Sequence, residues 1–158
     1  MPEANLNDHH YALFGRIIYG YAAAETRLKL LLSVLLDMHP GHFLIISEPY
    51  SSQDLRNVVK SIAKESKYDN EGELEEIISF VGRYKALSKM RNSIAHHRWG
   101  VGTRPDSVRP ISIDIRAGKA KAKGHSDEEQ DYTLDDLFNI ANDAFGLNND
   151  LNKFMKEN

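Results

Sequence analysis

The sequence predicts a mainly helical protein of four helices, with a small basic β-hairpin inserted before the last helix. In four separate stretches, apolar residues recur at three- and four-residue steps, the spacing of one helix face. Between the third and fourth stretches, glycine and proline become frequent and three isoleucines alternate with polar residues, which predicts a strand. The 158 residues, 41% hydrophobic and 27% charged, suit a single globular domain spanning 1–158.

The first helix is expected over residues 8–38. Its apolar residues form one continuous stripe of Phe14, Ile18, Tyr21, Leu28, Leu32 and Leu36. The stretch His39-Pro40-Gly41 should end this helix, because proline and glycine interrupt helical geometry. Glu25 lies at the centre of the stripe, where an unpaired charge is unfavourable. This carboxylate is therefore expected to have a partner in the core.

Two further helices should precede the strand. The apolar run 42–46 is too short to assign to a helix or a strand. The second helix should start at Ser51 or the next residue, because Ser51 and Asp54 have the spacing of a cap that satisfies free amides. After a polar, turn-like stretch, the third helix should cover residues 73 to 96 or 97.

A basic segment, about residues 98–125, follows the third helix. It holds seven basic and two acidic residues, a net charge of +5. Because the whole chain has a formal net charge of −3, the rest of the chain carries −8. The strand 111–116 should pair with 98–103 or with 119–123 as a hairpin. The segment is either an electrostatic contact for nucleic acid or a solvated loop. The last helix should begin after the acidic run 127–131, capped at residue 133.

The third predicted helix also places a charge among apolar residues. At about 100° per residue, Arg91 lies near the middle of its apolar stripe. Burying a lone guanidinium is costly, so Arg91 is expected either to pair with a carboxylate or to line a polar cleft. Because Glu25 and Arg91 have opposite charges, the first and third helices are expected to pack antiparallel with these two side chains facing each other.

The stretch around Arg91 carries the one chemical signal of the sequence. Residues 91–96 read Arg-Asn-Ser-Ile-Ala-His, with the arginine and the histidine at the end of the predicted helix. This arrangement resembles the R-x(4 to 6)-H motif of the HEPN superfamily, whose helical domains include many metal-independent endoribonucleases. The motif covers six residues of 158, and the long amphipathic helices add context. The resemblance implies an up-and-down four-helix bundle and no cofactor.

The same resemblance implies that Arg91 and His96 are catalytic. A base takes the proton of a ribose 2′-hydroxyl, the 2′-oxygen attacks the adjacent phosphate, and an acid protonates the leaving 5′-oxygen. Histidine suits both steps, because its unperturbed pKa of about 6.5 lies near working pH. The guanidinium of Arg91 would hold the phosphate and stabilise its charge, and Asn92 would position the phosphate or the sugar.

Five more residues are expected to contribute to this site. Arg98 is expected to touch phosphate, and Trp99 either stacks on a base or packs at the helix end. His97 should point about 100° away from the preceding histidine, towards solvent or backbone. Ser88 lies one helical turn before the motif. Together with Glu25, Ser88 and His97 are expected to support the catalytic residues.

RNA and a second copy of the chain are the expected partners. One motif histidine per chain is too few for two proton transfers, and HEPN enzymes resemble each other in pairing two motifs across this helix. The face with Leu74, Ile78 and Val81 fits a homodimer seam, and it also fits ordinary core. The resemblance allows an antitoxin or nucleotidyltransferase partner, in a toxin–antitoxin or defence system.

Composition argues against several other classes. The chain has no cysteine, so thiolate chemistry is excluded. No metal site is expected, because the adjacent histidines at 9–10 and 96–97 diverge on a helix. Without a leader-like start or an apolar run of membrane length, a cytoplasmic protein with no membrane contact is expected. Two alternatives stay open: a non-catalytic helical module that binds nucleotides, nucleic acid or a partner, and a duplex-DNA binder acting through the basic hairpin.

Overall fold

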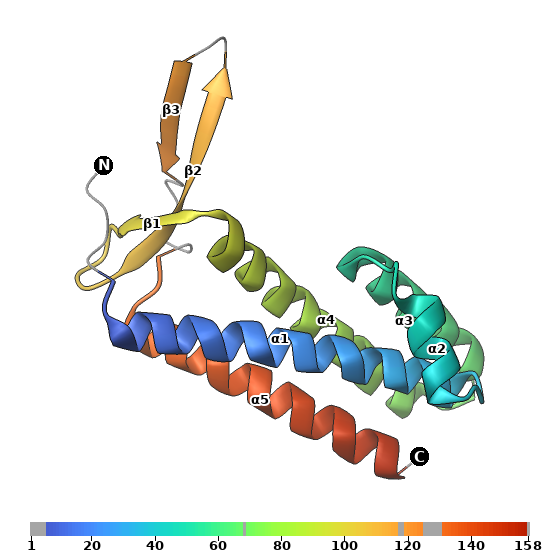
Figure 1. The fold of residues 1–158 in the computed structure, drawn as a ribbon. Coiled ribbons are helices and arrows are strands. Elements are labelled where there is room, and N and C mark those ends of the chain that lie inside the picture. The colour runs from blue at the N-terminus through green and yellow to red at the C-terminus, as the bar shows by residue number, and fades with distance from the viewer. Residues whose placement is uncertain (1–5, 68, 117–118, 125–130, 158) are drawn as a thin grey trace. The chain divides into compact units, whose positions relative to one another are not determined.

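The computed structural model describes residues 6–67, 69–116, 119–124 and 131–157, with only the backbone for 112–116 and 119–124. These residues form five helices and one three-stranded antiparallel sheet (Figure 1). The helices are α1 (Asp8–Leu35), α2 (Pro40–Ser47), α3 (Ser52–Ser66), α4 (Glu71–His96) and α5 (Leu134–Glu157). The strands are β1 (Arg98–Val101), β2 (Val108–Arg116) and β3 (Lys119–Gly124). The predicted class, mainly helical with a small sheet before the last helix, is confirmed.

The chain divides into two compact units, and each is described by itself. The first unit comprises Met1–Ile18 and Lys89–Asn142. The second comprises Tyr19–Ser88 and Asp143–Asn158. The division runs through α1, α4 and α5, so each of these helices contributes to both units. The expectation of a single domain stays a prediction.

The sheet of the first unit has β2 at its centre. β1 pairs with it from Arg98 opposite Ile111 to Val101 opposite Val108, and β3 pairs with its other half, ending at Arg116 opposite Lys119. The predicted strand therefore uses both of the expected partners. Beyond β1, β2 and β3 continue as a two-stranded ribbon (Figure 1).

The core of the first unit is built around Trp99. The indole ring packs against Phe14, with centroids 4.8 Å apart, and against Tyr132 at 6.0 Å. The buried residues of this cluster come from α1, the end of α4, the sheet and the start of α5: Leu13, Phe14, Ile17, Met90, Trp99, Val108, Leu137 and Ala141. Residues that are far apart in the sequence, Phe14 and Tyr132 among them, thus meet around one indole ring.

In the second unit, α1 and α5 approach closely at Gly20. A Cβ added there would lie 2.6 Å from the Cβ of Ala144, so this position requires glycine. Asn148, 7% exposed, donates from its amide to the carbonyls of Gly20 (3.0 Å) and Ala144 (2.8 Å). The largest fully buried side chains of this unit are Leu28, Leu31, Leu32, Leu55, Val59, Ile77, Tyr84, Leu87, Leu147 and Leu151.

Helix α1 ends earlier than predicted. Its last helical residue is Leu35, and Asp37 has a φ of +50°. The amide of Asp37 donates to the carbonyl of Val34, and the amide of Met38 to that of Ser33, which is a Schellman motif with aspartate in the left-handed position. These backbone hydrogen bonds therefore end the helix before the proline is reached. Pro40, expected to stop it, instead occupies the first turn of α2.

Two predicted helix starts are confirmed by their caps. Ser51 and Asp54 form a capping box at α3, with the Ser51 hydroxyl accepting from the Asp54 amide at 3.1 Å. Thr133 and Asp136 exchange the same pair of bonds at α5, at 2.9 and 3.1 Å. The short run 42–46, left unassigned by its pattern, lies in α2.

The proposed seam on α4 is partly core. Val81 is 1% exposed and Ser88 is 7% exposed, so these two side chains are not available to a second copy. Ile78 is 37% exposed. Further along the same helix face, Lys85, Asn92 and His96 are also exposed. The exposed residues of this face are therefore mainly polar.

Candidate functional site

The motif residues lie on the last turns of α4, in the first unit. Arg91 is half-buried, whereas Asn92 and His96 are exposed. A guanidinium nitrogen of Arg91, Nη1, donates to Oδ1 of Asn92 at 3.1 Å. This bond orients the guanidinium relative to the amide of Asn92. The helix end therefore presents a cation, an amide and an imidazole within six residues of sequence.

Beyond His96, the chain turns into β1 and lines a groove. The amide of His97 still donates to the carbonyl of Ser93 at 3.2 Å, and β1 begins at the next residue. The groove has a volume of about 510 Å³. Its lining, all within the first unit, is Leu6, Tyr11, Phe14, Gly15, Ile18, Ile94, His97, Arg98 and Trp99. Three of the residues expected at the site are thus brought together on one concave surface.

His97 is more buried than expected, whereas Trp99 takes the packing position that was one of its two expected roles. His97 is half-buried, and its Nδ1 is buried without a hydrogen-bond partner among the described residues. Trp99 is 7% exposed, and its ring lies against Phe14 and Tyr132. Its indole Nε1 is likewise buried and unpartnered within the described part of the chain. Trp99 therefore serves as packing, and its role in binding substrate stays a prediction.

The supporting residues Glu25 and Ser88 lie in the second unit. Glu25 pairs with Lys29 at 3.3 Å, one turn further along α1. The hydroxyl of Ser52 donates to that of Ser88 at 2.8 Å, which joins α3 to α4. Arg91 belongs to the other unit, so the predicted facing of Glu25 and Arg91 stays a prediction.

Two stacked tyrosines, Tyr21 and Tyr84, lie near Glu25 in the second unit. The rings of Tyr21 and Tyr84 are 5.3 Å apart, and the Tyr84 hydroxyl donates to that of Tyr21 at 3.1 Å. Burial raises the pKa of Tyr84 well above its usual value, and the nearby carboxylate of Glu25 acts in the same direction. Tyr84 is therefore a neutral hydrogen-bonding group at any pH at which the protein would work.

A carboxylate that the sequence did not single out organises the turn between β1 and β2. Asp131, 3% exposed, accepts hydrogen bonds from the amide and hydroxyl of Thr103 and from the amide of Arg104. The hydroxyl of Ser107 lies 3.4 Å from the same oxygen. Asp131 was part of a predicted acidic run, and nothing local in the sequence distinguishes it from its neighbours. The rest of that run, 127–130, falls outside the described residues.

Arg104 has a structural role that corrects one expectation about the basic segment. Its guanidinium donates to the carbonyl of Asp131 and to the carboxylate of Asp136 at 2.8 Å. As part of the basic segment, Arg104 was expected either to contact nucleic acid or to be solvated, but these bonds join the β1–β2 turn to the start of α5. The other predicted basic positions include Arg116 and the lysines of β3, for which the backbone register alone is described.

Comparisons of the chain with protein-family models, curated proteins and solved structures found no match. No helix within the described ranges is long and apolar enough to cross a membrane. Among the residues that the structure describes, no three histidine or acidic side chains gather as metal ligands.

Proposed function

We propose that this protein is a metal-independent endoribonuclease of the HEPN type. The observation that carries the proposal is the end of α4, where Asn92 and His96 are exposed and Arg91 is hydrogen-bonded to Asn92. An exposed helix end is accessible to a polymer as large as RNA. The three side chains supply a cation for phosphate, an amide for orientation and an imidazole for proton transfer.

The reaction follows from these groups. A neutral imidazole of His96 accepts the proton of a ribose 2′-hydroxyl, and the 2′-oxygen forms a bond to the adjacent phosphorus. The bond from phosphorus to the 5′-oxygen breaks, and an imidazolium gives its proton to that oxygen. The products are a 2′,3′-cyclic phosphate and a free 5′-hydroxyl. The guanidinium of Arg91 stabilises the charge on the phosphate oxygens throughout.

The second histidine comes from a second copy of the chain. In this proposal α1, α3, α4 and α5 form an up-and-down HEPN-like bundle, and two copies meet at the exposed part of α4 around Lys85, Asn92 and His96. Light scattering at micromolar concentration tests the assembly, with a homodimer as the expected result. A monomer that cleaves RNA would contradict this mechanism.

A cleavage assay in EDTA tests the activity. Labelled single-stranded RNA should be cut by the wild type, and His96→Ala should lose about 10²-fold to 10⁴-fold in rate. The melting temperature should stay nearly unchanged, because His96 is exposed. His42→Ala, which removes an exposed histidine from α2, is the matched control and should cleave normally. A folded and fully active His96→Ala protein would sink the ribonuclease assignment.

Arg91→Lys separates catalysis from folding. Lysine keeps the positive charge but loses the planar, bidentate geometry that matches phosphate, so most of the activity should disappear while the fold survives. A loss of stability without a selective loss of cleavage would assign Arg91 to structure alone.

The second candidate function is a non-catalytic module that binds nucleic acid or nucleotides, and the groove beside the motif favours it. Such a module would bind the labelled RNA and leave it intact in the same assay. Competition between RNA and duplex DNA identifies a protein that acts on DNA through the basic hairpin.

A role in a toxin–antitoxin or defence system, with an antitoxin or nucleotidyltransferase partner, belongs to the ribonuclease proposal.

A further inference from the structure

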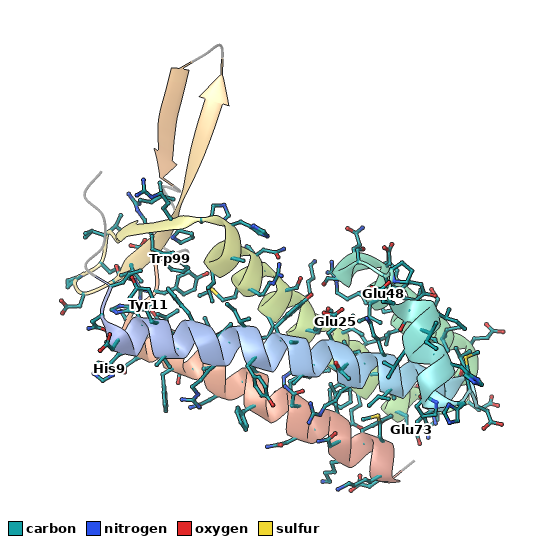
Figure 2. All side chains as sticks on the ribbon, in the orientation of Figure 1. His9, Tyr11, Glu25, Glu48, Glu73 and Trp99 are labelled. Atoms are coloured by element: carbon teal, nitrogen blue, oxygen red, sulfur yellow. The ribbon has the colours of Figure 1, made fainter. Side chains whose placement is uncertain are left out.

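The groove beside the motif is lined partly by α1 residues whose side chains do not pack into the core. Tyr11 is 59% exposed and Ile18 is 39% exposed, two large apolar side chains at solvent-facing positions of α1. Between them, Gly15 lines the groove. Figure 2 shows Tyr11 and Trp99 between the start of α1 and β1. The groove thus joins an exposed aromatic side chain to a buried aromatic core.

Gly15 is the most informative of these residues. It lies in the interior of α1, where glycine is the least favourable residue after proline. A Cβ at this position would meet nothing within 4 Å, in contrast to Gly20, where it would collide with Ala144. No packing contact within the described part of the chain therefore requires glycine at this position. A glycine of this kind allows a bound molecule to approach the helix backbone closely.

The polar groups of the groove favour a flat molecule with negative charge. Arg98 is exposed on the lining and carries a fixed positive charge. His97 and Trp99 also line the groove, and each holds a buried ring nitrogen without a hydrogen-bond partner among the described residues. An exposed tyrosine offers a face on which an unpaired base stacks, whatever its identity. A volume of about 510 Å³ is in the range of small-ligand sites.

We propose that this groove binds one unstacked nucleobase of a single-stranded RNA, stacked on Tyr11 and seated over Gly15, with its phosphate near Arg98. The inference rests on the proposed function: His97 on the groove lining directly follows His96 in the chain, and in this proposal one RNA strand extends from His96 into the groove. The base is the nucleotide next to the scissile phosphate. The groove accordingly selects unpaired RNA over duplex, because a paired base cannot leave its stack without cost.

A binding experiment with an uncleavable strand tests the groove separately from catalysis. The probe is a 2′-O-methyl oligoribonucleotide of six residues, which lacks the attacking hydroxyl. Trp99 is the single tryptophan of the chain, so its fluorescence reports on the groove directly. Wild type should show a saturable change in emission. The same oligonucleotide with one abasic position at its centre should bind more weakly than the intact strand by about tenfold, roughly the contribution of one stacked base.

Gly15→Leu fills the groove, and Gly82→Leu is its matched control. Gly82 is an exposed interior glycine of α4 where a Cβ also meets nothing within 4 Å, and it does not line the groove. Both variants should fold, as circular dichroism will verify. Gly15→Leu should lose at least tenfold in affinity for the oligonucleotide, and Gly82→Leu should bind as wild type does. Wild-type affinity in a folded Gly15→Leu protein would overturn the proposal.

The outcomes also separate this inference from the proposed function. If His96→Ala stops cleavage while Gly15→Leu still binds the probe fully, the groove proposal fails and the ribonuclease stands. If His96→Ala remains active while Gly15→Leu loses binding, the groove stands as a nucleotide site and the catalytic assignment fails. If Gly15→Leu converts a dimer into a monomer by light scattering without a change in affinity, the groove is an interface between copies, which overturns the proposal.

Discussion

Asp131→Ala should destabilise the protein by an amount that the structure allows us to work out. The substitution removes the acceptor of two backbone amides, those of Thr103 and Arg104, and of the Thr103 hydroxyl. A hydrogen bond to a charged group contributes about 1.5 to 3 kcal/mol. Thr103 and Arg104 are exposed, so water recovers part of the loss. We therefore expect a decrease of about 2 to 4 kcal/mol in the free energy of unfolding.

Urea unfolding of three variants measures this decrease. Asp131→Asn keeps an oxygen acceptor of the same shape but loses the charge, so its effect should be smaller than that of alanine. Glu75→Ala, on an exposed position of α4, is the control and should stay within about 0.5 kcal/mol of wild type. If Asp131→Ala unfolds with the free energy of the control, the clamp at the β1–β2 turn contributes nothing and the reasoning is refuted.

The same carboxylate makes stability sensitive to acid. Burial raises the pKa of Asp131, but hydrogen bonds from Thr103 and Arg104 outweigh it and hold the pKa below its usual value. A lowered pKa in the folded state stabilises the protein above the unfolded pKa, about 3.9 for aspartate, and this stability is lost as pH falls through the folded value. As the pH is lowered from about 5 through the folded pKa of Asp131, wild type should therefore lose more stability than Asp131→Asn, as measured by urea titrations at successive pH values. Parallel losses in the two proteins would contradict this linkage.

Three further substitutions probe the packing and the basic segment. Gly20→Ala should cost about 1 to 3 kcal/mol in urea unfolding, because its Cβ would lie 2.6 Å from that of Ala144, and a neutral result would refute the close approach. Tyr84→Phe should lower the free energy of unfolding by about 1 kcal/mol, because it removes the hydroxyl that donates to Tyr21. Thermal unfolding by circular dichroism checks this, and an unchanged or raised melting temperature would contradict it. Arg104→Ala should lower the melting temperature while leaving the slope of log affinity against log salt for RNA nearly unchanged, and a flattened slope would place this arginine on phosphate after all.

The local parts of this fold could be read from the sequence because their causes are local. A helix requires apolar residues at its own period, and a capping box requires two side chains three residues apart, as at Ser51 and Asp54. The alternation of isoleucines predicted β2 for the same reason. The end of α1 was misplaced because its Schellman motif uses Asp37 at positive φ, which sequence patterns assign to glycine.

The same distinction between local and long-range causes applies to the candidate site. The spacing of Arg91, Asn92 and His96 on one helix end was legible from the sequence, since three residues within six positions need no tertiary information. Which of the basic residues are available for RNA was not legible. Arg104 looked like its neighbours, and only the approach of Asp136, 32 residues later, assigns it to structure.

The sequence by itself determined the four long helices, the central strand, the charge asymmetry and the motif, because each depends on residues that are close in the chain. Only the tertiary structure decided that Gly15 opens onto a groove while Gly20 packs against Ala144, and that Trp99 is buried against Phe14. Two glycines of one helix are equivalent in sequence. They differ only in what the folded chain brings opposite them, and those contacts join residues about 85 to 125 positions apart, whose pairing no local pattern records.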